Sequence, residues 1–200
     1  VYINDRKAGD AIISSKKTNQ HYIFSSTISI VELNTMIVTK NKVIETLTFK
    51  PVRFETKNYV FKKNINQKTM IKGTFRNNKI YLNLNGIKSV VSVDPACILE
   101  GGYFISKLIE NNFKPGYTIT KKVFSADLDS TKPILATYTV KKPKQETIHQ
   151  KKELLHHVKV SLGNAYFINI YFSKIGITKK VQIKMLHNKI TFILNTFSNE

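Results

Sequence analysis

The sequence has a single cysteine, Cys97, and no tryptophan. One cysteine cannot form a disulfide within the chain, so the chain must fold on its hydrophobic core alone. No run of residues approaches the ~18 consecutive apolar positions that a membrane-spanning helix needs. The sequence therefore predicts no transmembrane segment and excludes a scaffold held together by disulfides.

Acidic residues are scarce, with 13 Asp and Glu against 32 Lys and Arg, which gives a net charge of +19. Such a balance can indicate nucleic acid or an anionic membrane surface as the partner. However, only Arg6, Arg53 and Arg76 are arginine, the residue that recognises phosphates and guanine edges best. Lys, Asn and Ile are abundant together, as an A/T-rich genome would produce whatever the function. Nucleic acid is therefore the less favoured partner, and base composition the favoured origin of the charge.

Sequence motifs of the commonest enzyme classes are missing too. The chain has no G-x-x-x-x-G-K-[ST], no G-x-G-x-x-G after a strand, no H-E-x-x-H and no G-x-S-x-G, which removes the usual nucleotide, zinc-hydrolase and α/β-hydrolase readings. The carboxylates are scattered, and no pair of them suggests an acid/base couple. The sequence therefore predicts a protein that is not an enzyme and that has no cofactor.

Two local features were weighed as reactive sites. His156 and His157 are adjacent in a predicted strand, so their side chains point to opposite faces and cannot easily share a metal ion. Cys97 lies among Ala96, Ile98 and Leu99, surroundings that favour an inert buried thiol over a nucleophile. We therefore predict no metal site and no catalytic residue.

Apolar residues alternate with polar ones along most of the chain, from Val1 to Phe197. This period of two is typical of half-buried antiparallel strands, and Asn77-Asn78 and Asn85-Gly86 are tight-turn signals between them. We see no long linker and no repeat. The sequence predicts a mainly β fold, a single large curved antiparallel sheet (a half-barrel) wrapped around a short helix, forming one domain over residues 1–200.

The pattern changes over residues 101–113, where apolar residues recur at spacings of three and four, as in an amphipathic helix. Two roles are open for its apolar stripe. It can plug the concave side of the sheet as core, which is the commoner use of such a stripe. Alternatively, helix and sheet leave between them an apolar cleft able to hold an acyl chain. The candidate ligand-binding residues of that cleft are Tyr103, Phe104, Leu108 and Ile109.

Two passages resemble bacterial envelope proteins of unknown function. They are Val1-Tyr2-Ile3-Asn4 with Lys7-Ala8-Gly9, and Asp94-Pro95 through the helix to Phe113-Lys114-Pro115-Gly116-Tyr117 and Val123-Phe124-Ser125. The fold of those proteins is similar to the half-barrel of the LolA/LolB lipoprotein carriers. The resemblance implies a periplasmic location, with a signal peptide removed before Val1. The carriers hold acyl chains in their concave cavity, and no binding residue of theirs can be matched here.

The leading hypothesis is a non-enzymatic periplasmic or envelope protein that binds a lipid, a lipoprotein or another hydrophobic envelope component in the concave face of the sheet. One alternative is a binder of polyanions, either nucleic acid or anionic polysaccharide, through the Lys-rich surface; Tyr59 and Phe61 near Lys62-Lys63 would then stack on bases. Another alternative is a structural module that offers a sheet edge to an envelope protein partner.

Overall fold

The computed structural model describes residues 1–99, 101–163, 166–184 and 188–194. Contacts within the chain divide it into two compact units. Unit 1 comprises Val1–Lys7, Gly101–Lys121 and Leu135–Glu200, and unit 2 comprises Ala8–Glu100 and Lys122–Ile134. The single domain over residues 1–200 stays a prediction. The predicted alternation up to Phe197 ends outside the described residues.

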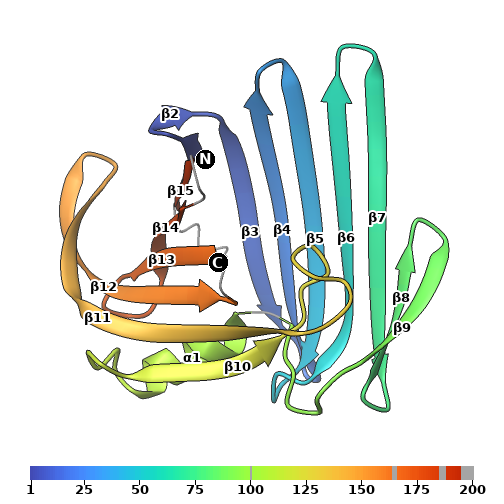
Figure 1. Ribbon diagram of the computed structural model, residues 1–200. Coiled ribbons are helices and arrows are strands. Elements are labelled where there is room, and N and C mark those ends of the chain that lie inside the picture. The colour runs from blue at the N-terminus through green and yellow to red at the C-terminus, as the bar shows by residue number, and fades with distance from the viewer. Residues whose placement is uncertain (100, 164–165, 185–187, 195–200) are drawn as a thin grey trace. The chain divides into compact units, whose positions relative to one another are not determined.

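Unit 1 is built around an eight-stranded antiparallel sheet, which we call sheet A (Figure 1). Its order is β10-β11-β12-β13-β14-β15-β1-β2, so the first strands of the chain pair with the last. The strands are β1 (Tyr2–Ile3), β2 (Arg6–Lys7), β10 (Thr118–Val123), β11 (Ile134–Ile148), β12 (Lys151–Leu162), β13 (Tyr166–Phe172), β14 (Thr178–Lys184) and β15 (Lys189–Ile193).

Unit 2 holds a seven-stranded antiparallel meander, sheet B, whose order follows the chain from β3 to β9. Its turns match the expected signals, because Asn77, Asn78, Asn85 and Gly86 all have positive φ, as two-residue hairpin loops require. The strands are β3 (Gly9–Lys17), β4 (His21–Glu32), β5 (Thr35–Thr46), β6 (Pro51–Lys62), β7 (Ile65–Arg76), β8 (Lys79–Leu84) and β9 (Ile87–Ser92).

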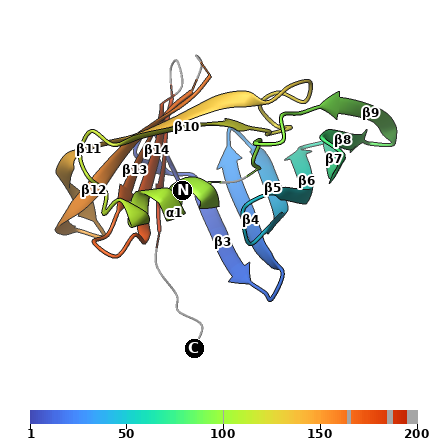
Figure 2. The ribbon, with the colours of Figure 1, turned by 90° about the horizontal axis from the view of Figure 1, so that it is seen from below.

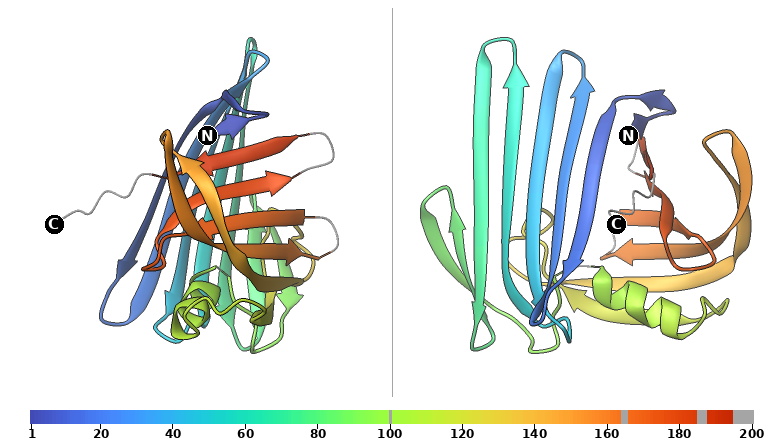
Figure 3. Two further views of the ribbon diagram at one scale, coloured as in Figure 1. Left: turned by 90° about the vertical axis from the view of Figure 1, so that its left-hand side faces the viewer. Right: turned by 180° about the vertical axis from the view of Figure 1, so that it is seen from behind.

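The helix α1 (Gly102–Glu110) lies in unit 1 beside sheet A (Figures 2 and 3). The amphipathic spacing predicted it within residues 101–113. It ends at Glu110, and the chain then turns through Asn112 and Phe113, both at positive φ. The backbone N–H of Phe113 donates to the Leu108 carbonyl at 2.9 Å, which satisfies one of the carbonyls left open at a helix C-terminus.

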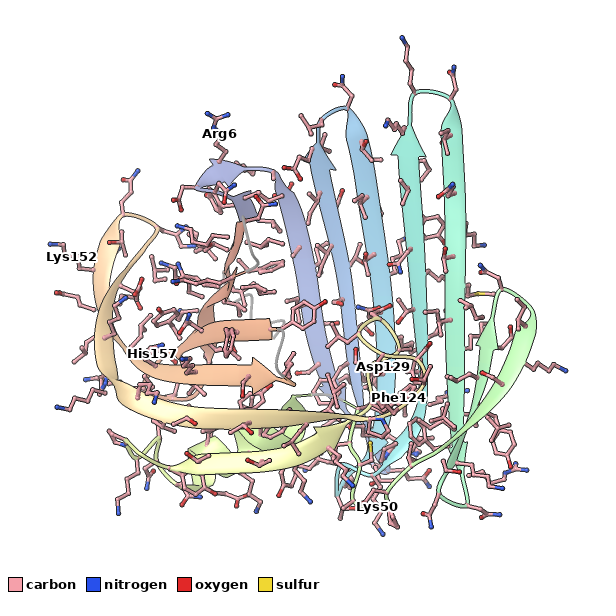
Figure 4. The ribbon with its side chains drawn as sticks, viewed as in Figure 1. Arg6, Lys50, Phe124, Asp129, Lys152 and His157 are labelled. Atoms are coloured by element: carbon pink, nitrogen blue, oxygen red, sulfur yellow. The ribbon has the colours of Figure 1, made fainter. Side chains whose placement is uncertain are left out.

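Each unit buries hydrophobic side chains of its own. In unit 2, Phe54, Ile80 and Leu82 from one face of sheet B pack with Cys97 and Phe124 from the segments that cross that face (Figure 4). Gly73 makes room for this core, since a Cβ at that position would lie 2.1 Å from the Phe54 ring. In unit 1 the buried residues include Phe104, Leu108, Val158, Val160 and Phe172.

The predicted fold class is confirmed as mainly β, with open antiparallel sheets and one short helix in the described residues. The strands are shared between two sheets, where the alternation suggested a single one. The period of two reports that a segment is a half-buried strand, and carries no information on which strands pair. No helix in the described part of the chain has the length and apolarity to cross a bilayer.

Candidate functional site

The four residues predicted to line a cleft have different places in the structure. Phe104 is 1% exposed and Leu108 fully buried, and the Phe104 ring stacks on Tyr138 with 3.9 Å between ring centroids. Tyr103 is half-buried with Lys121 Nζ 5.1 Å from its ring centroid. Ile109 is exposed on one side. The apolar stripe of α1 is therefore core, and a ligand at these four residues stays a prediction.

Ile109 nevertheless leads to a second place where a ligand can bind, the β13–β14 loop (residues 173–177). Gly176 in this loop has φ +81°, and a Cβ there would lie 2.8 Å from Ile109 Cδ1. The Ser173 hydroxyl accepts from the Ile177 N–H at 3.1 Å, and the Ser173 N–H donates to the Ile177 carbonyl at 2.8 Å. The loop is thus closed by its own hydrogen bonds and rests on the side of α1.

Between this loop and the start of β12 runs a groove of about 500 Å³, which we call the β12–β14 groove. Its apolar wall includes Leu154, 62% exposed, and Ile175, 76% exposed, and cationic side chains border it. The lining residues are Glu153, Leu154, Leu155, Ser173, Lys174, Ile175, Ile177 and Lys179. Two large aliphatic side chains thus stand open to solvent beside two lysines, and the volume falls in the range of small-molecule sites.

Aromatic packing beneath the groove holds its parts in place. Phe113, just after α1, stacks on His156 of β12 with 4.6 Å between centroids and contacts Phe172 of β13 at 5.2 Å. Burial in this contact lowers the pKa of His156, because desolvation disfavours the imidazolium. The strand and the loop on either side of the groove are therefore both tied to the segment that ends the helix.

A second cavity of about 540 Å³ in unit 1 has a wall of mixed polarity. Thr191, 5% exposed, lines it, and its hydroxyl has no hydrogen-bond partner among the described residues. The lining residues are Tyr2, Asp5, Thr147, His149, Gln150, Lys180, Gln182, Thr191 and Ile193. Polar and apolar atoms contribute about equally to this wall, whereas the wall of the β12–β14 groove is mainly apolar.

The ammonium group of Lys180, which lines this second cavity, is already paired with Glu146. Lys180 Nζ lies 2.7 Å from Glu146 Oε2, and Lys144 Nζ lies 2.6 Å from Glu146 Oε1. Burial raises the pKa of Glu146, but the two lysine hydrogen bonds outweigh it and the pKa is lowered overall. The attraction of Lys180 for an anionic ligand is correspondingly reduced, since Glu146 sits beside it.

The two reactive features weighed from the sequence are also placed. His156 contacts Phe113, whereas His157 stacks on Tyr171 and hydrogen-bonds Asn169 at 2.9 Å, so the two rings point to different sides of β12. No group of three His, Cys, Asp or Glu that could hold a metal ion occurs in the described residues. Cys97 is buried, and this burial raises the pKa of its thiol to about 11.

Sequence reasoning missed the groove residues. In the sequence, Lys174 and Gly176 belong to a short turn between two alternating segments and Leu154 belongs to another such segment, so none of them stands out as a site residue. The available signal was Ile175 and Ile177 on either side of a glycine in a turn, where polar residues are the rule. The groove itself depends on β12 lying against a loop some twenty residues further on, which no local pattern encodes.

Comparison with known proteins supports the fold and leaves the activity open. No family model matches the chain, and no curated protein matches it. A crystal structure of a β-barrel-like protein of the domain of unknown function DUF1849 from Brucella abortus is similar, with a TM-score of 0.66 and 12% identity over 90% of this chain and 83% of that one. This likeness shows a shared β-barrel-like fold.

A DUF1089 family protein from Pseudomonas aeruginosa also aligns, with a TM-score of 0.43 and 9% identity over 87% of this chain and 90% of that one. A score that low carries no argument on fold or function. The LolA/LolB resemblance and the periplasmic location accordingly stay predictions.

Proposed function

We propose that this protein is a non-enzymatic envelope protein that binds an amphiphile, a lipid or an acylated molecule, in the β12–β14 groove. The observation that carries the proposal is the groove itself, where exposed Leu154 and Ile175 face a shared space bordered by Lys174 and Lys179. Large exposed aliphatic side chains lining a concave surface are characteristic of binding sites.

Each part of the groove matches one part of such a ligand. The aliphatic wall offers apolar surface, and burying it against an acyl chain would contribute roughly 25 cal/mol per Å² of area removed from water. Lys174 and Lys179 would attract a carboxylate or phosphate head group. An ammonium group at a partly exposed position adds about 1 kcal/mol or less, so chain burial supplies most of the affinity and the lysines select the sign of the head group.

This proposal keeps the predicted ligand class and moves its place from the helix stripe to the neighbouring loop. Phe104 and Leu108 act as core, and Ile109 supports Gly176 in the loop. The predicted periplasmic location is part of the proposal, because acylated envelope components must be shielded from water between membranes.

The first test is native mass spectrometry on the freshly purified protein, with organic extraction of any bound molecule. We expect an acylated species at up to one copy per chain. The second test is titration with a dansyl-labelled fatty acid, for which we expect the variant L154E/I175E to bind at least about tenfold more weakly than the wild type, because charge replaces apolar wall.

The matched control is Leu135→Glu, since Leu135 is an exposed leucine of unit 1 that does not line the groove. It should leave dansyl fatty acid binding unchanged. Equal binding by the groove variant and by the wild type would reject the groove as the site. A clean mass without ligand, together with no fatty acid binding, would favour the structural module instead.

A further inference from the structure

Unit 2 exposes an apolar side chain at the end of its sheet, at a position unrelated to the β12–β14 groove. Leu33 lies in the two-residue loop between β4 and β5 and is 90% exposed. This loop and the β6–β7 loop project from the same end of sheet B (Figures 1 and 3). Lys50, in the β5–β6 connection, marks the opposite end of these strands (Figure 4).

The backbone at Leu33 does not favour leucine. Leu33 and Asn34 have φ values of +47° and +61°, the conformation of a type I′ hairpin loop, for which Asn-Gly and Asp-Gly are preferred. A left-handed residue other than Gly, Asn or Asp costs about 1 kcal/mol or more, and Leu33 gains no burial in return. Neither local conformation nor packing within the chain explains this leucine. We therefore infer that its side chain contacts a partner outside the chain.

The apolar surface continues from the loop onto one face of the sheet. Val31, Met36 and Phe61 lie directly opposite one another across β4, β5 and β6, and all three are exposed. This face is the one opposite the Phe54 core. Leu33 lies in the loop that adjoins these residues, and we call the four together the tip patch (Val31, Leu33, Met36 and Phe61).

Cationic side chains continue from the tip patch along this face toward the opposite end of the strands, and Lys68 is the nearest of them. On the same face of β5, β6 and β7 the register places seven cations and one carboxylate, Glu55, which pairs with Lys57 and Lys72. Lys68 Nζ sits 5.9 Å from the ring centroid of Tyr59, which stacks on Phe61 of the tip patch. The β6–β7 loop adds Lys62 and Lys63, both exposed. The seven cations are Lys40, Lys42, Arg53, Lys57, Lys68, Lys72 and Arg76.

We propose that this end of unit 2 docks on an anionic lipid bilayer, with the tip patch in the interface and the lysines on the head groups. An apolar tip backed by a cationic band matches the two layers of such a surface, the acyl boundary and the negative head groups. A soluble polyanion would satisfy the lysines alone and leave Leu33 in water, which is why the bilayer is favoured. The inference does not depend on the amphiphile groove.

Vesicle sedimentation tests the proposal. The wild type should bind phosphatidylcholine vesicles containing phosphatidylglycerol, and more weakly those of pure phosphatidylcholine. Leu33→Asn should weaken binding to the anionic vesicles at least about tenfold, since burying a leucine side chain stabilises the bound state by a free energy that corresponds to such a factor. Asparagine suits the loop conformation, so a folding defect cannot explain the loss. K62Q/K63Q should also weaken binding, by up to about fivefold per lysine at low salt.

The matched control is Ile87→Asn. Ile87 is 72% exposed and directly follows the β8–β9 hairpin loop of unit 2, whereas Leu33 lies within its own loop. The Asn85 N–H of that loop donates to the Met70 carbonyl, five residues along β7 from the tip, or about 16 Å at the usual rise per residue. Binding to anionic vesicles should be the same for Ile87→Asn and the wild type.

Insertion itself can be followed by fluorescence, because the chain has no tryptophan. The emission of Leu33→Trp should shift to the blue and be quenched by brominated lipids when anionic vesicles are added, while that of Ile87→Trp should not change. Three results would overturn the proposal. The first is that the wild type does not bind anionic vesicles, and the second is that Leu33→Asn binds them as well as the wild type does. The third is that heparin prevents vesicle binding, that lipid does not displace the bound heparin, and that Leu33→Asn binds heparin as tightly as the wild type. The last would identify a polyanion face.

Discussion

Leu33, Phe113 and His149 all adopt a positive φ, which few side chains tolerate well. Phe113 is buried against His156 and Phe172, so its packing offsets the backbone cost. Leu33 has no such contact. The same backbone conformation therefore has different consequences at the two residues: it places the Phe113 side chain in the core and the Leu33 side chain in solvent.

Gly176 is the residue on which the groove loop depends. In Gly176→Ala the left-handed backbone and the close approach to Ile109 act together, and we expect a loss of at least about 2 kcal/mol in the free energy of unfolding. Gly163→Ala is the control, because Gly163 also has a positive φ but its Cβ would meet nothing within 4 Å. It should lose about 1 kcal/mol. Urea denaturation measures both, and equal losses would show that the Ile109 contact is unimportant.

At the scale of elements, the β11–β12 hairpin shows where the sequence was informative and where it was not. Most strands and the Asn-containing turns could be predicted, since alternation and left-handed loop residues are local properties. Residues 141–152 are so polar that their sequence does not indicate a half-buried strand, yet β11 continues to Ile148. Lys142 and Pro143 fall where the β11–β12 register shifts, and such an irregularity is where a sheet tolerates proline.

Glu146 is what makes the polar half of this hairpin stable, because it accepts from lysines of β11 and β14 at once. Glu146→Gln should lower the free energy of unfolding at pH 7 by about 1–3 kcal/mol. Since the pKa of Glu146 is lowered from 4.5 in the folded state, its contribution is complete above that value and is lost as the pH falls below it.

The difference between Glu146→Gln and the wild type should therefore shrink as urea titrations are repeated at decreasing pH below 4.5. Glu32→Gln, at an exposed strand end, serves as the comparison and should change stability by less than about 0.5 kcal/mol. A gap between Glu146→Gln and wild type that is the same at pH 7 and pH 3 would contradict the role of the charge.

The site was less accessible from sequence than the strands. The helix and its buried stripe follow from spacing, and Phe104 and Leu108 were correctly placed on that stripe. Leu154 and Ile175 come together only through the pairing of β12 with β13 and the path of the following loop. Which residues of two strands lie side by side depends on the pairing register of the whole sheet, and a short stretch of sequence does not determine that register.

At the scale of the whole molecule, the chain passes between the two units four times, and β10 and β11 each have residues in both. Neither unit is a continuous segment, so we expect them to unfold together. Gly73→Ala, which crowds Phe54 in unit 2, should cost about 1–3 kcal/mol. It and Gly176→Ala in unit 1 should lower the midpoint of the same transition.

Circular dichroism and tyrosine fluorescence during urea denaturation measure that transition. Coincident curves in the wild type and in both variants would support one cooperative domain. Two transitions, with one shifted only by Gly73→Ala and the other only by Gly176→Ala, would show two domains and reject the prediction over residues 1–200.

The burial of Cys97 makes its alkylation a probe of how the unit 2 core opens. A thiol whose pKa is raised to about 11 and that lies inside the unit 2 core is almost silent toward alkylating reagents, which attack the thiolate. Each alkylation event therefore records an excursion in which that core opens. Because the chain has no other thiol, the rate at which its mass increases in native buffer reports how often this core opens, once the reagent is concentrated enough for alkylation to outpace reclosing.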